Sequence, residues 1–351
     1  MAWKAALGLL VSGLALWWVF RDVDLGHVAA DIGRADPLLF LLSAAAATGV
    51  FWIRAWRWKA LLEPVCPGTT FRSRFAAVTI GFMGNNLLPA RVGEFARAYA
   101  LSRMTPVPIV ASFGSLVLER LLDGVFVVGF LFVAMWLPGF PGFPGGQFEY
   151  MGVVRSAGVT VLAAVGLLMV MVFWPAGSVR LLERAAVRVL PKRIARLVVD
   201  ALEAFLAGVG ALREPRLMAR ALAWSAALWL FNAVGFWIAF AAFDLELGYV
   251  AALFLQSVVA LMVSVPSAPG FWGVFELAAD VVLVGLWGQA EVRALAYAVG
   301  FHLAGFIPVT LLGLWYAWRL GLSVGELGRS EEVVEQEVER TTGVTPEHPR
   351  L

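Results

Sequence analysis

The sequence predicts an all-α polytopic integral membrane protein, with about six full spans and two broken or re-entrant helical hairpins in an inverted-topology repeat. Three observations lead to this fold class. First, 61% of the 351 residues are hydrophobic and 15% are charged, whereas a soluble domain carries about 45–50% apolar and about 25% charged residues. Second, the chain contains six apolar runs of at least about 17 residues, long enough to cross a bilayer as a helix. Third, two further apolar runs are interrupted near their middles.

Six apolar segments have the length and composition of full spans. They cover residues 3–20, 37–56, 108–137, 151–174, 217–243 and 294–318. The first of them is followed by the charged letters RDVD and has no A-x-A cleavage pattern. We therefore predict a retained first membrane helix rather than a signal peptide that is removed.

Basic residues set the predicted orientation, because Lys and Arg accumulate in cytoplasmic loops. Segments 54–74 and 178–220 are rich in basic residues, mostly arginine, whereas 137–147 and 244–248 contain no Lys or Arg. The first basic segment contributes Arg54, Arg57, Lys59, Arg72 and Arg74. We therefore expect a multi-pass protein of the cytoplasmic membrane of a prokaryote, with the N- and C-termini in the cytoplasm.

The first broken region, 75–103, has basic residues at both edges, so both of its ends are expected on the cytoplasmic side. Its two halves are too short to cross about 30 Å each. A re-entrant helical hairpin that opens inward satisfies both facts. Pro89 and Gly93 mark its break, since proline lacks an amide hydrogen and glycine allows close backbone approach.

The second broken region, 249–288, is flanked by segments expected outside, and its deepest part holds three helix breakers. These are Pro266, Pro269 and Gly270. Its halves are longer, so an outward-opening hairpin and a pair of full spans both stay open. In either case the second half of the chain is inserted upside down relative to the first. Corresponding broken segments of such inverted repeats meet near the midplane and form a transport site.

The predicted domains follow from this repeat. Residues 1–320 form a membrane domain with halves 1–150 and 151–320, joined by a basic connector at 178–212. The connector is either an amphipathic helix on the cytoplasmic leaflet or a cytosolic helical hairpin. The final 28 residues hold seven acidic side chains against three arginines. We therefore expect 321–351 to be a disordered cytoplasmic tail.

Composition also excludes several function classes. The chain outside its tail is basic, which suits contact with anionic lipid. No basic stripe is interleaved with polar recognition residues, so no nucleic-acid partner is expected. The single cysteine, Cys66, excludes an intramolecular disulfide, and the three histidines show no ligand spacing. We therefore expect no metal and no cofactor.

The first hairpin carries the main candidate binding residues. Its second helix points a positive N-terminus at the break, with Arg91 in the first turn, an arrangement that suits a phosphate group. Asn85 and Asn86 either satisfy the broken backbone or contact a polar ligand, and both interpretations stay open. Glu94 and Arg97 are three residues apart and can pair on one helix face.

The third span contains three ionisable residues, Glu119, Arg120 and Asp123, which must face a partner or a wet cavity. They either clamp the first hairpin in place or contact substrate. Arg91 and Arg97 need carboxylates, and this span can supply them.

Three polar residues, Gln256, Ser267 and Glu276, lie near the break of the second hairpin. Glu276 is expected to pair with an arginine from the first half of the chain. His302 lies on the last span, where we interpret it as hydrogen-bonded packing in preference to a proton relay.

Three spaced motifs resemble one family. The stretches GNNLLPARVGEFARAYALSR, LVLERLLDG and VPSAPGFWGVFE are similar to the flippase-like membrane domain of the lysylphosphatidylglycerol synthetases. The resemblance covers about residues 3–320 and implies a lipid-translocating domain built from two inverted halves. The full synthetases add a soluble aminoacyl-transfer domain, whereas an acidic tail follows residue 320 here. Synthesis of lysyl- or alanyl-phosphatidylglycerol is therefore not expected of this chain.

The preferred hypothesis is flippase-like translocation of an anionic or modified phospholipid, or of a polyprenyl-phosphate lipid, rather than an enzymatic activity. Arg91, Arg97 and the helix N-terminus behind the break would hold the anionic head group. The alternative is an intramembrane transferase, or an accessory subunit in lipid-linked glycan or aminoacyl-lipid metabolism. A non-transporting scaffold is a third interpretation. The expected partner is a membrane lipid, and assembly into homo-oligomers stays open.

Overall fold

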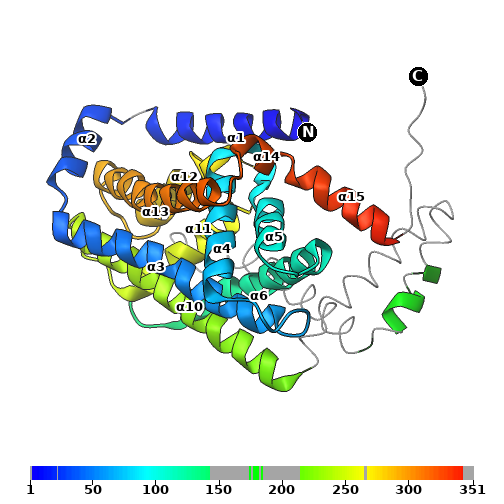
Figure 1. Cartoon of the computed structure of the whole chain (residues 1–351). Coiled ribbons are helices and arrows are strands. Elements are labelled where there is room, and N and C mark those ends of the chain that lie inside the picture. The colour runs from blue at the N-terminus through cyan, green and yellow to red at the C-terminus, as the bar shows by residue number, and fades with distance from the viewer. Residues whose placement is uncertain are drawn as a thin grey trace.

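The computed structural model describes residues 2–21, 23–142, 174, 177–181, 183–184, 214–264 and 267–342. Every regular element in these ranges is a helix. Most of the predicted span 151–174 and of the connector 178–212 lies outside them, as does Pro266. The molecule is an all-α polytopic membrane protein, as the composition predicts (Figure 1).

The described helices fall into two groups on either side of the central gap in the chain. The first group comprises α1 (Ala2–Phe20), α2 (Leu25–Arg34), α3 (Pro37–Leu62), α4 (Phe71–Leu87), the 3-10 turn η1 (Pro89–Arg91), α5 (Gly93–Met104) and α6 (Ile109–Trp136). The second group comprises α10 (Pro215–Ala242), α11 (Tyr249–Met262), η3 (Pro269–Phe271), α12 (Val274–Leu283), α13 (Glu291–Arg319), α14 (Val324–Gly328) and α15 (Ser330–Thr342).

Side-chain caps begin several of these helices. Asp36 accepts hydrogen bonds from the N–H groups of Leu38 and Leu39, both at 2.9 Å, and Pro37 occupies the first helical position of α3. Thr70 accepts from the N–H of Ser73 at 3.1 Å and starts α4. Such caps satisfy amide groups that have no partner within the helix.

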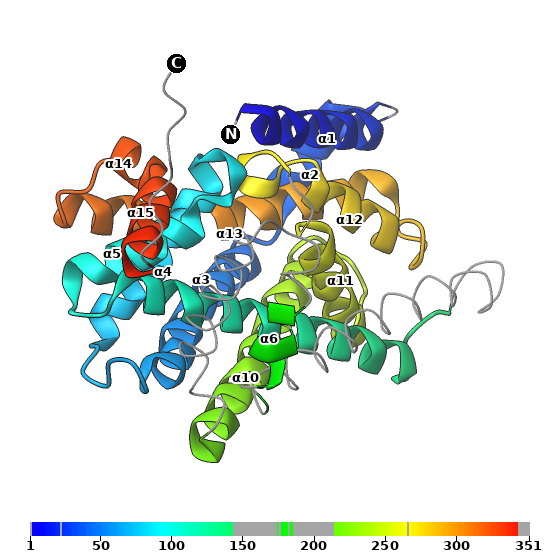
Figure 2. The same cartoon turned by 90° about the vertical axis from the view of Figure 1, so that its right-hand side faces the viewer.

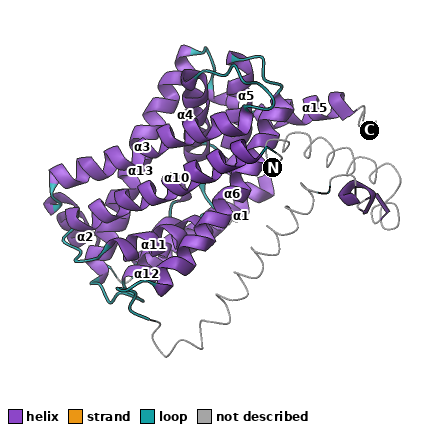
Figure 3. Ribbon diagram, turned by 90° about the horizontal axis from the view of Figure 1, so that it is seen from below, coloured by secondary structure: helices purple, strands orange, loops and turns teal. Residues whose placement is uncertain are grey.

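Three of the described helices, α3, α10 and α13, are long and apolar enough to cross a membrane. Their 26, 28 and 29 residues correspond to lengths of about 39–44 Å, which exceed a hydrocarbon core of about 30 Å. Figures 1 and 3 show these three helices side by side, and each packs on the other two. Helix α6 has 28 residues but carries three charged side chains near its middle.

Both broken regions form helical hairpins with short arms. Helices α4 and α5 have 17 and 12 residues, and α11 and α12 have 14 and 10. At about 1.5 Å per residue these arms reach only about 15–26 Å, less than a hydrocarbon core. The two arms of each hairpin pack on one another. Region 249–288 is therefore a hairpin with a broken tip and not a pair of full spans.

The tips of the two hairpins meet beneath α1 (Figure 2). Each tip begins at a proline and ends at a non-glycine residue with positive φ, 58° at Arg91 and 63° at Phe271. The guanidinium carbon of Arg91 lies 5.5 Å from the centroid of the Phe271 ring. Helix α1 covers this junction, and its Ser12 hydroxyl accepts a hydrogen bond from the N–H of Ala268 at 2.8 Å.

The C-terminal helices dock on the membrane body. Helix α14 contacts α4 and α5, and α15 contacts α5 and α6. Leu327 and Val334, seven residues apart, are buried in the same apolar cluster as α4 and α5, and the Tyr99 hydroxyl donates to Glu326 at 2.5 Å. The expectation of a disordered tail is therefore wrong for residues 324–342, because two apolar side chains anchor this acidic segment. The N-terminal end of α1 lies at the same end of the molecule as α14 and α15 (Figure 1).

Candidate functional site

An ion-pair cluster, buried except for Arg120, joins α3, α5 and α6. We define it as Arg54, Arg57, Arg97, Arg120, Glu119 and Asp123. Arg57 Nη1 lies 2.5 Å from Asp123 Oδ1, and Arg54 Nη1 lies 3.2 Å from Asp123 Oδ2. Arg97 binds Glu119 with both terminal nitrogens, at 2.8 and 2.9 Å. The pairs tie the returning arm of the first hairpin and the third span to α3.

Helical spacing explains why these groups meet. Glu119 and Asp123 are four residues apart on α6, and Arg54 and Arg57 are three apart on α3, so each pair shares one helix face. The ring of Trp58 lies 3.9 Å from the Arg97 guanidinium carbon. A cation above an indole face is favourable when both are desolvated.

The ion-pair cluster carries excess positive charge. Four arginines face two carboxylates, which leaves a formal charge of +2. Glu94, whose Oε1 lies 3.6 Å from Arg120 Nε, lowers this to +1. The predicted pairing of Glu94 with Arg97 is wrong, because the Arg97 guanidinium is buried against Glu119 instead.

The positions of Arg54 and Arg57 contradict a second expectation. The sequence places them at the cytoplasmic flank, yet they are 7% and 0% exposed and sit within the ion-pair cluster. Helical spacing is the sequence signal for this pairing. Arg54 and Arg57 share one face of their helix, as Glu119 and Asp123 share one face of theirs. The Arg97–Glu119 pair ties α6 to the first hairpin, which favours the interpretation of α6 as a clamp.

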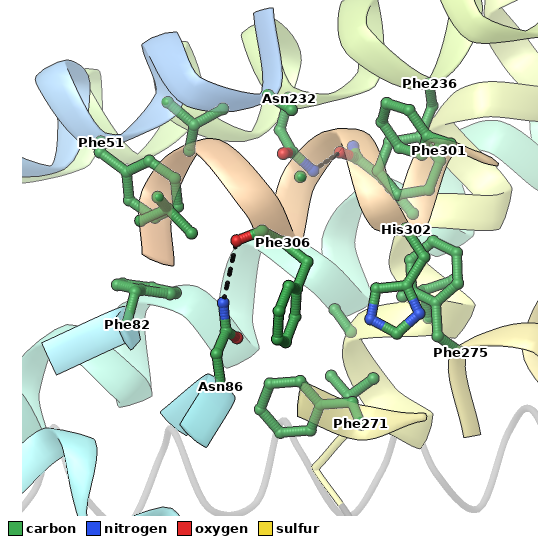
Figure 4. Close-up of a pocket in the computed structure, with 18 of the residues that line it drawn as sticks. Phe51, Phe82, Asn86, Asn232, Phe236, Phe271, Phe275, Phe301, His302 and Phe306 are labelled. Atoms are coloured by element: carbon green, nitrogen blue, oxygen red, sulfur yellow. Dashed lines mark hydrogen bonds between the residues drawn. The ribbon is translucent and has the colours of Figure 1, made fainter. Parts of the chain in front are cut away.

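A central cavity of about 250 Å³ lies next to the ion-pair cluster. Its walls come from α3, α4, α10, α11, η3, α12 and α13, and Figure 4 shows its polar side chains approaching from different helices. Eight aromatic side chains line it: Phe51, Phe82, Trp229, Phe236, Phe271, Phe275, Phe301 and Phe306. Its polar lining residues are Arg54, Asn86, Asn232, Gln256 and His302. Arg54 thus belongs to both the cavity and the ion-pair cluster.

The carboxamides of the cavity are held by the protein. Asn86 Nδ2 donates to the Thr310 hydroxyl at 2.8 Å, and Figure 4 shows its weaker bond to the carbonyl of Phe306 at 3.4 Å. Asn232 Nδ2 donates to Gln256 Oε1 at 2.8 Å. By contrast, Arg54 Nε is buried and has no acceptor among the described residues.

The two asparagines at the tip of the first hairpin have different roles. Asn85 Oδ1 accepts from the N–H of Gly93 at 3.0 Å, so Asn85 satisfies the broken backbone. Asn86 lines the cavity. Arg91 is half-buried, and no carboxylate of the described residues lies within 4 Å of it. The expectation that Arg91 forms a carboxylate ion pair is therefore wrong, because its side chain lies over Phe271.

The second hairpin is held by a different pair. Glu276 Oε2 accepts from the N–H of Gly273 at 2.6 Å, and Glu276 Oε1 lies 2.6 Å from His302 Nδ1. The expected pairing of Glu276 with an arginine is wrong, because the carboxylate caps its own helix and contacts α13. His302 has a hydrogen-bond partner at each ring nitrogen, since Nε2 also contacts the Gly270 carbonyl at 2.8 Å.

The candidate residues therefore divide into three sets. Asn86 and Gln256 line the cavity, whereas Arg97, Glu119, Arg120 and Asp123 form the ion-pair cluster. Asn85, Arg91, Glu94, Ser267 and Glu276 lie at the hairpin tips or beside them and do not line the cavity. Within the described part of the chain, no group of three or more His, Cys, Asp or Glu residues is arranged to hold a metal ion.

Comparison with known proteins gives a match over nearly the whole chain. Residues 5–313 match the family described as the lysylphosphatidylglycerol synthase TM region. Glycosyltransferase AglD of Haloferax volcanii is 30% identical over 335 residues, which cover 87% of this chain and 52% of that protein. The UPF0104 membrane protein MJ1595 of Methanocaldococcus jannaschii is 27% identical over 139 residues, 39% of this chain and 40% of that protein. The alignments thus span about half of the first relative and two-fifths of the second.

Proposed function

Because the chain belongs to the family of the lysylphosphatidylglycerol synthase transmembrane region, we propose that it translocates a lipid with an anionic head group across the membrane. The substrate class is an anionic or modified phospholipid or a polyprenyl-phosphate lipid. The observation that carries this proposal is the central cavity, which combines aromatic walls with the Arg54 side chain.

The shape of the molecule supports a transport site at this point. In inverted-repeat transporters, broken helices from the two halves meet near the midplane around the substrate. Here η1 and η3 touch, and α4, η3 and α12 contribute walls to the cavity. Rocking of one half against the other would expose the cavity to each side in turn.

The charge distribution supports an anionic head group. The ion-pair cluster has a formal positive excess, and Arg54 brings that excess to the cavity wall. Arg91 lies at the adjoining tip without an ion-pair partner among the described residues. Guanidinium groups bind phosphate oxygens through charge-assisted hydrogen bonds. In this proposal Arg54 and Arg91 hold the head group, Asn86 and Gln256 complete the polar lining, and Arg97, Glu119 and Asp123 fix the hairpin.

The proposed location is the cytoplasmic membrane of a prokaryote, with both termini in the cytoplasm. The basic residues of segments 54–74 and 178–220 support this orientation. The two relatives come from Haloferax volcanii and Methanocaldococcus jannaschii, which are prokaryotes.

A vesicle assay tests the proposed transport. Purified protein is reconstituted into phosphatidylcholine vesicles with a trace of head-labelled anionic phospholipid or labelled polyprenyl phosphate, and dithionite quenches the label in the outer leaflet. Transport removes the protected inner-leaflet signal that protein-free vesicles retain. Protected signal equal to that of protein-free vesicles for both lipids would contradict the proposal.

A matched pair of arginine variants links transport to the cavity. Arg54→Gln removes the cation at the cavity wall, and we expect transport to slow about tenfold to a hundredfold, as expected for a lost charge-assisted hydrogen bond. Arg216→Gln removes an exposed cation at the start of α10 and serves as the control. Equal transport by the two variants would exclude Arg54 from the binding site.

A second candidate function rests on the relative named glycosyltransferase AglD. Under this alternative the chain is an intramembrane transferase, or the membrane subunit of a lipid-linked glycosylation pathway. Incubation of the purified protein with labelled sugar nucleotides and polyprenyl phosphate distinguishes the candidates. Formation of a glycolipid without vesicle transport would favour the transferase.

A further inference from the structure

His302 contacts a hydrogen-bond acceptor at each ring nitrogen. Nε2 lies 2.8 Å from the carbonyl oxygen of Gly270, and Nδ1 lies 2.6 Å from Oε1 of Glu276. A carbonyl oxygen only accepts, so Nε2 carries a hydrogen. The other oxygen of Glu276 already accepts from the N–H of Gly273 at 2.6 Å.

These contacts fix the number of protons on the pair. A carboxylate facing a bare Nδ1 at 2.6 Å would place two lone pairs against each other. One proton must therefore lie between Nδ1 and Oε1, whether it is assigned to the imidazole or to the carboxyl group. The pair with this proton is neutral overall, and without it the pair carries one negative charge.

The Glu276–His302 pair lies in a buried, aromatic environment next to the cavity. Glu276 is 0% and His302 8% exposed, and His302 lines the cavity between the rings of Trp272 and Phe275, 4.3 and 4.5 Å away. The other charged group in the cavity lining is Arg54 on α3, and α4, α10 and α11 contribute carboxamides. From the neighbouring tip, η1 brings Arg91 to Phe271, and α1 brings the Ser12 hydroxyl to Ala268.

We propose that the Glu276–His302 pair is a proton-binding site and that it binds its proton together with the anionic lipid. This inference rests on the function proposed above. An anion in the cavity and a deprotonated pair would be two like charges in a space with aromatic walls, where the low dielectric strengthens their repulsion. Lipid binding therefore favours the protonated pair, and by reciprocity protonation favours lipid binding.

Loss of the proton also acts on the hairpin itself. Without it, the ring has one hydrogen for two acceptors, so either the contact of Nδ1 with Glu276 Oε1 or that of Nε2 with the Gly270 carbonyl is lost. Both contacts join the second hairpin to α13, and Gly270 and Gly273 at the tip of this hairpin have φ of 73° and 85°. The proton thus binds where it can couple lipid occupancy to the position of the second hairpin.

The test measures the affinity for dihexanoyl phosphatidylglycerol as a function of pH, by calorimetry on the purified full chain. This soluble probe is a phosphodiester, so its own charge stays constant over the range. We expect the affinity of the wild type to fall about tenfold per pH unit once the pair loses its proton, the slope of one linked proton. Calorimetry in two buffers of different ionisation enthalpy should then show proton uptake on binding.

Glu276→Gln is the decisive variant. Its amide oxygen can accept from the N–H of Gly273 while its NH₂ donates to Nδ1, which mimics the protonated carboxyl group. We expect its affinity for the probe to be independent of pH. The control is His27→Gln, which changes an exposed histidine on α2 and should keep the wild-type slope. A flat wild-type profile, or a Glu276→Gln profile with the wild-type slope, would overturn the inference.

A second experiment distinguishes failure of the proposed lipid binding from failure of the proposed proton site. If the probe binds at no pH, the proposed function fails, and a nuclear magnetic resonance titration of ¹⁵N-labelled histidine, assigned with His302→Gln, decides the proton site. Ring shifts of His302 that change between mildly acidic and alkaline pH support a site that exchanges its proton. Shifts that stay constant across that range overturn it.

Discussion

Arg97 and Glu119 form a two-pronged ion pair that joins the returning arm of the first hairpin to α6. Their nitrogen–oxygen distances are 2.8 and 2.9 Å, and the residues are 3% and 0% exposed. Glu119 also lies 3.1 Å from Arg57 Nη2 and 2.9 Å from Arg120 Nη2. Arg54 Nη1 lies 3.5 Å from Glu119 Oε1. One carboxylate therefore contacts four guanidinium groups, and the structure of the cluster depends on it.

Glu119→Gln should destabilise the fold strongly. The amide keeps the shape of the side chain but removes the charge, so Arg57 and Arg97 lose their main compensation in a buried environment. Breaking a buried ion pair by removing one partner costs about 3–5 kcal/mol. Thermal unfolding of the purified protein in detergent, followed by scanning fluorimetry, measures the loss.

Glu94→Gln is the matched control for that loss. Glu94 is partly exposed and makes one contact at 3.6 Å with Arg120, which is itself 40% exposed. Exposed pairs contribute about 0–1 kcal/mol, so this variant should unfold close to the wild-type temperature. Equal effects of the two substitutions would show that Glu119 is no more structural than a surface carboxylate.

Gly93→Ala should prevent the first hairpin from closing. A Cβ atom on Gly93 would overlap the Gly81 carbonyl oxygen and would lie 2.6 Å from the backbone nitrogen of Asn85. Backbone atoms cannot move aside as flexible side chains do, so we expect a cost of at least about 1–3 kcal/mol. The yield of monodisperse protein in size-exclusion chromatography and its unfolding temperature report the effect.

Gly124→Ala tests whether any added methyl group is harmful. Gly124 lies inside α6, and a Cβ there would meet nothing within 4 Å. Alanine favours helix over glycine by about 1 kcal/mol, so this variant should be neutral or stabilised. If Gly124→Ala lowered the stability as much as Gly93→Ala, the close approach of α4 and α5 would not be the cause of the destabilisation.

The bases of the two hairpins should be accessible from opposite faces of the membrane. In a Cys66→Ser background, Gly68→Cys marks the loop before α4 and Ala290→Cys marks the loop before α13; both positions are exposed. The basic flank of α4 predicts cytoplasmic exposure of position 68, and the inverted repeat predicts external exposure of position 290. Labelling of intact cells and of inside-out vesicles with an impermeant maleimide gives the measurement. If both positions react from the same face, the inverted topology is excluded.

Much of the fold could be predicted because lipid enforces simple rules. Length and composition identify α3, α10 and α13, and the prolines at 89 and 269 mark both broken hairpins, since proline cannot continue a helix. The length of the second hairpin left two topologies open. Only the observed arms of 14 and 10 residues exclude two full spans.

The partners of the charged residues could not be predicted in the same way. Arg54 and Arg57 match the positive-inside pattern, yet their own helix carries them into the interior, where Glu119 and Asp123 face them. Glu276 sits at the third position of α12, so its local cap on Gly273 and a histidine 26 residues later outcompete any distant arginine. The partner of each charged residue depends on which helices lie close together in space, and spacing along one helix does not give this information.

Arg91 combines an unusual backbone with a side chain that has no ion pair among the described residues. Its φ of 58° lies in the left-handed region, which costs a non-glycine residue about 1–3 kcal/mol. Residues with such strain cluster at active sites and ligand clamps. Asparagine tolerates this region better than arginine. Arg91→Asn should therefore leave the free energy of unfolding unchanged or raise it by up to about 1 kcal/mol.

The same substitution should weaken binding of the anionic lipid. If Arg91 is retained at the tip for its charge, its loss removes one charge-assisted hydrogen bond, and affinity for dihexanoyl phosphatidylglycerol falls about tenfold or more. Arg103→Gln removes an exposed cation from the last turn of the same α5 helix and should change neither property. Calorimetry and scanning fluorimetry on both variants separate the two roles. Lower stability with unchanged affinity in Arg91→Asn would show that the stacking on Phe271, and not the binding of an anion, keeps arginine in this strained position.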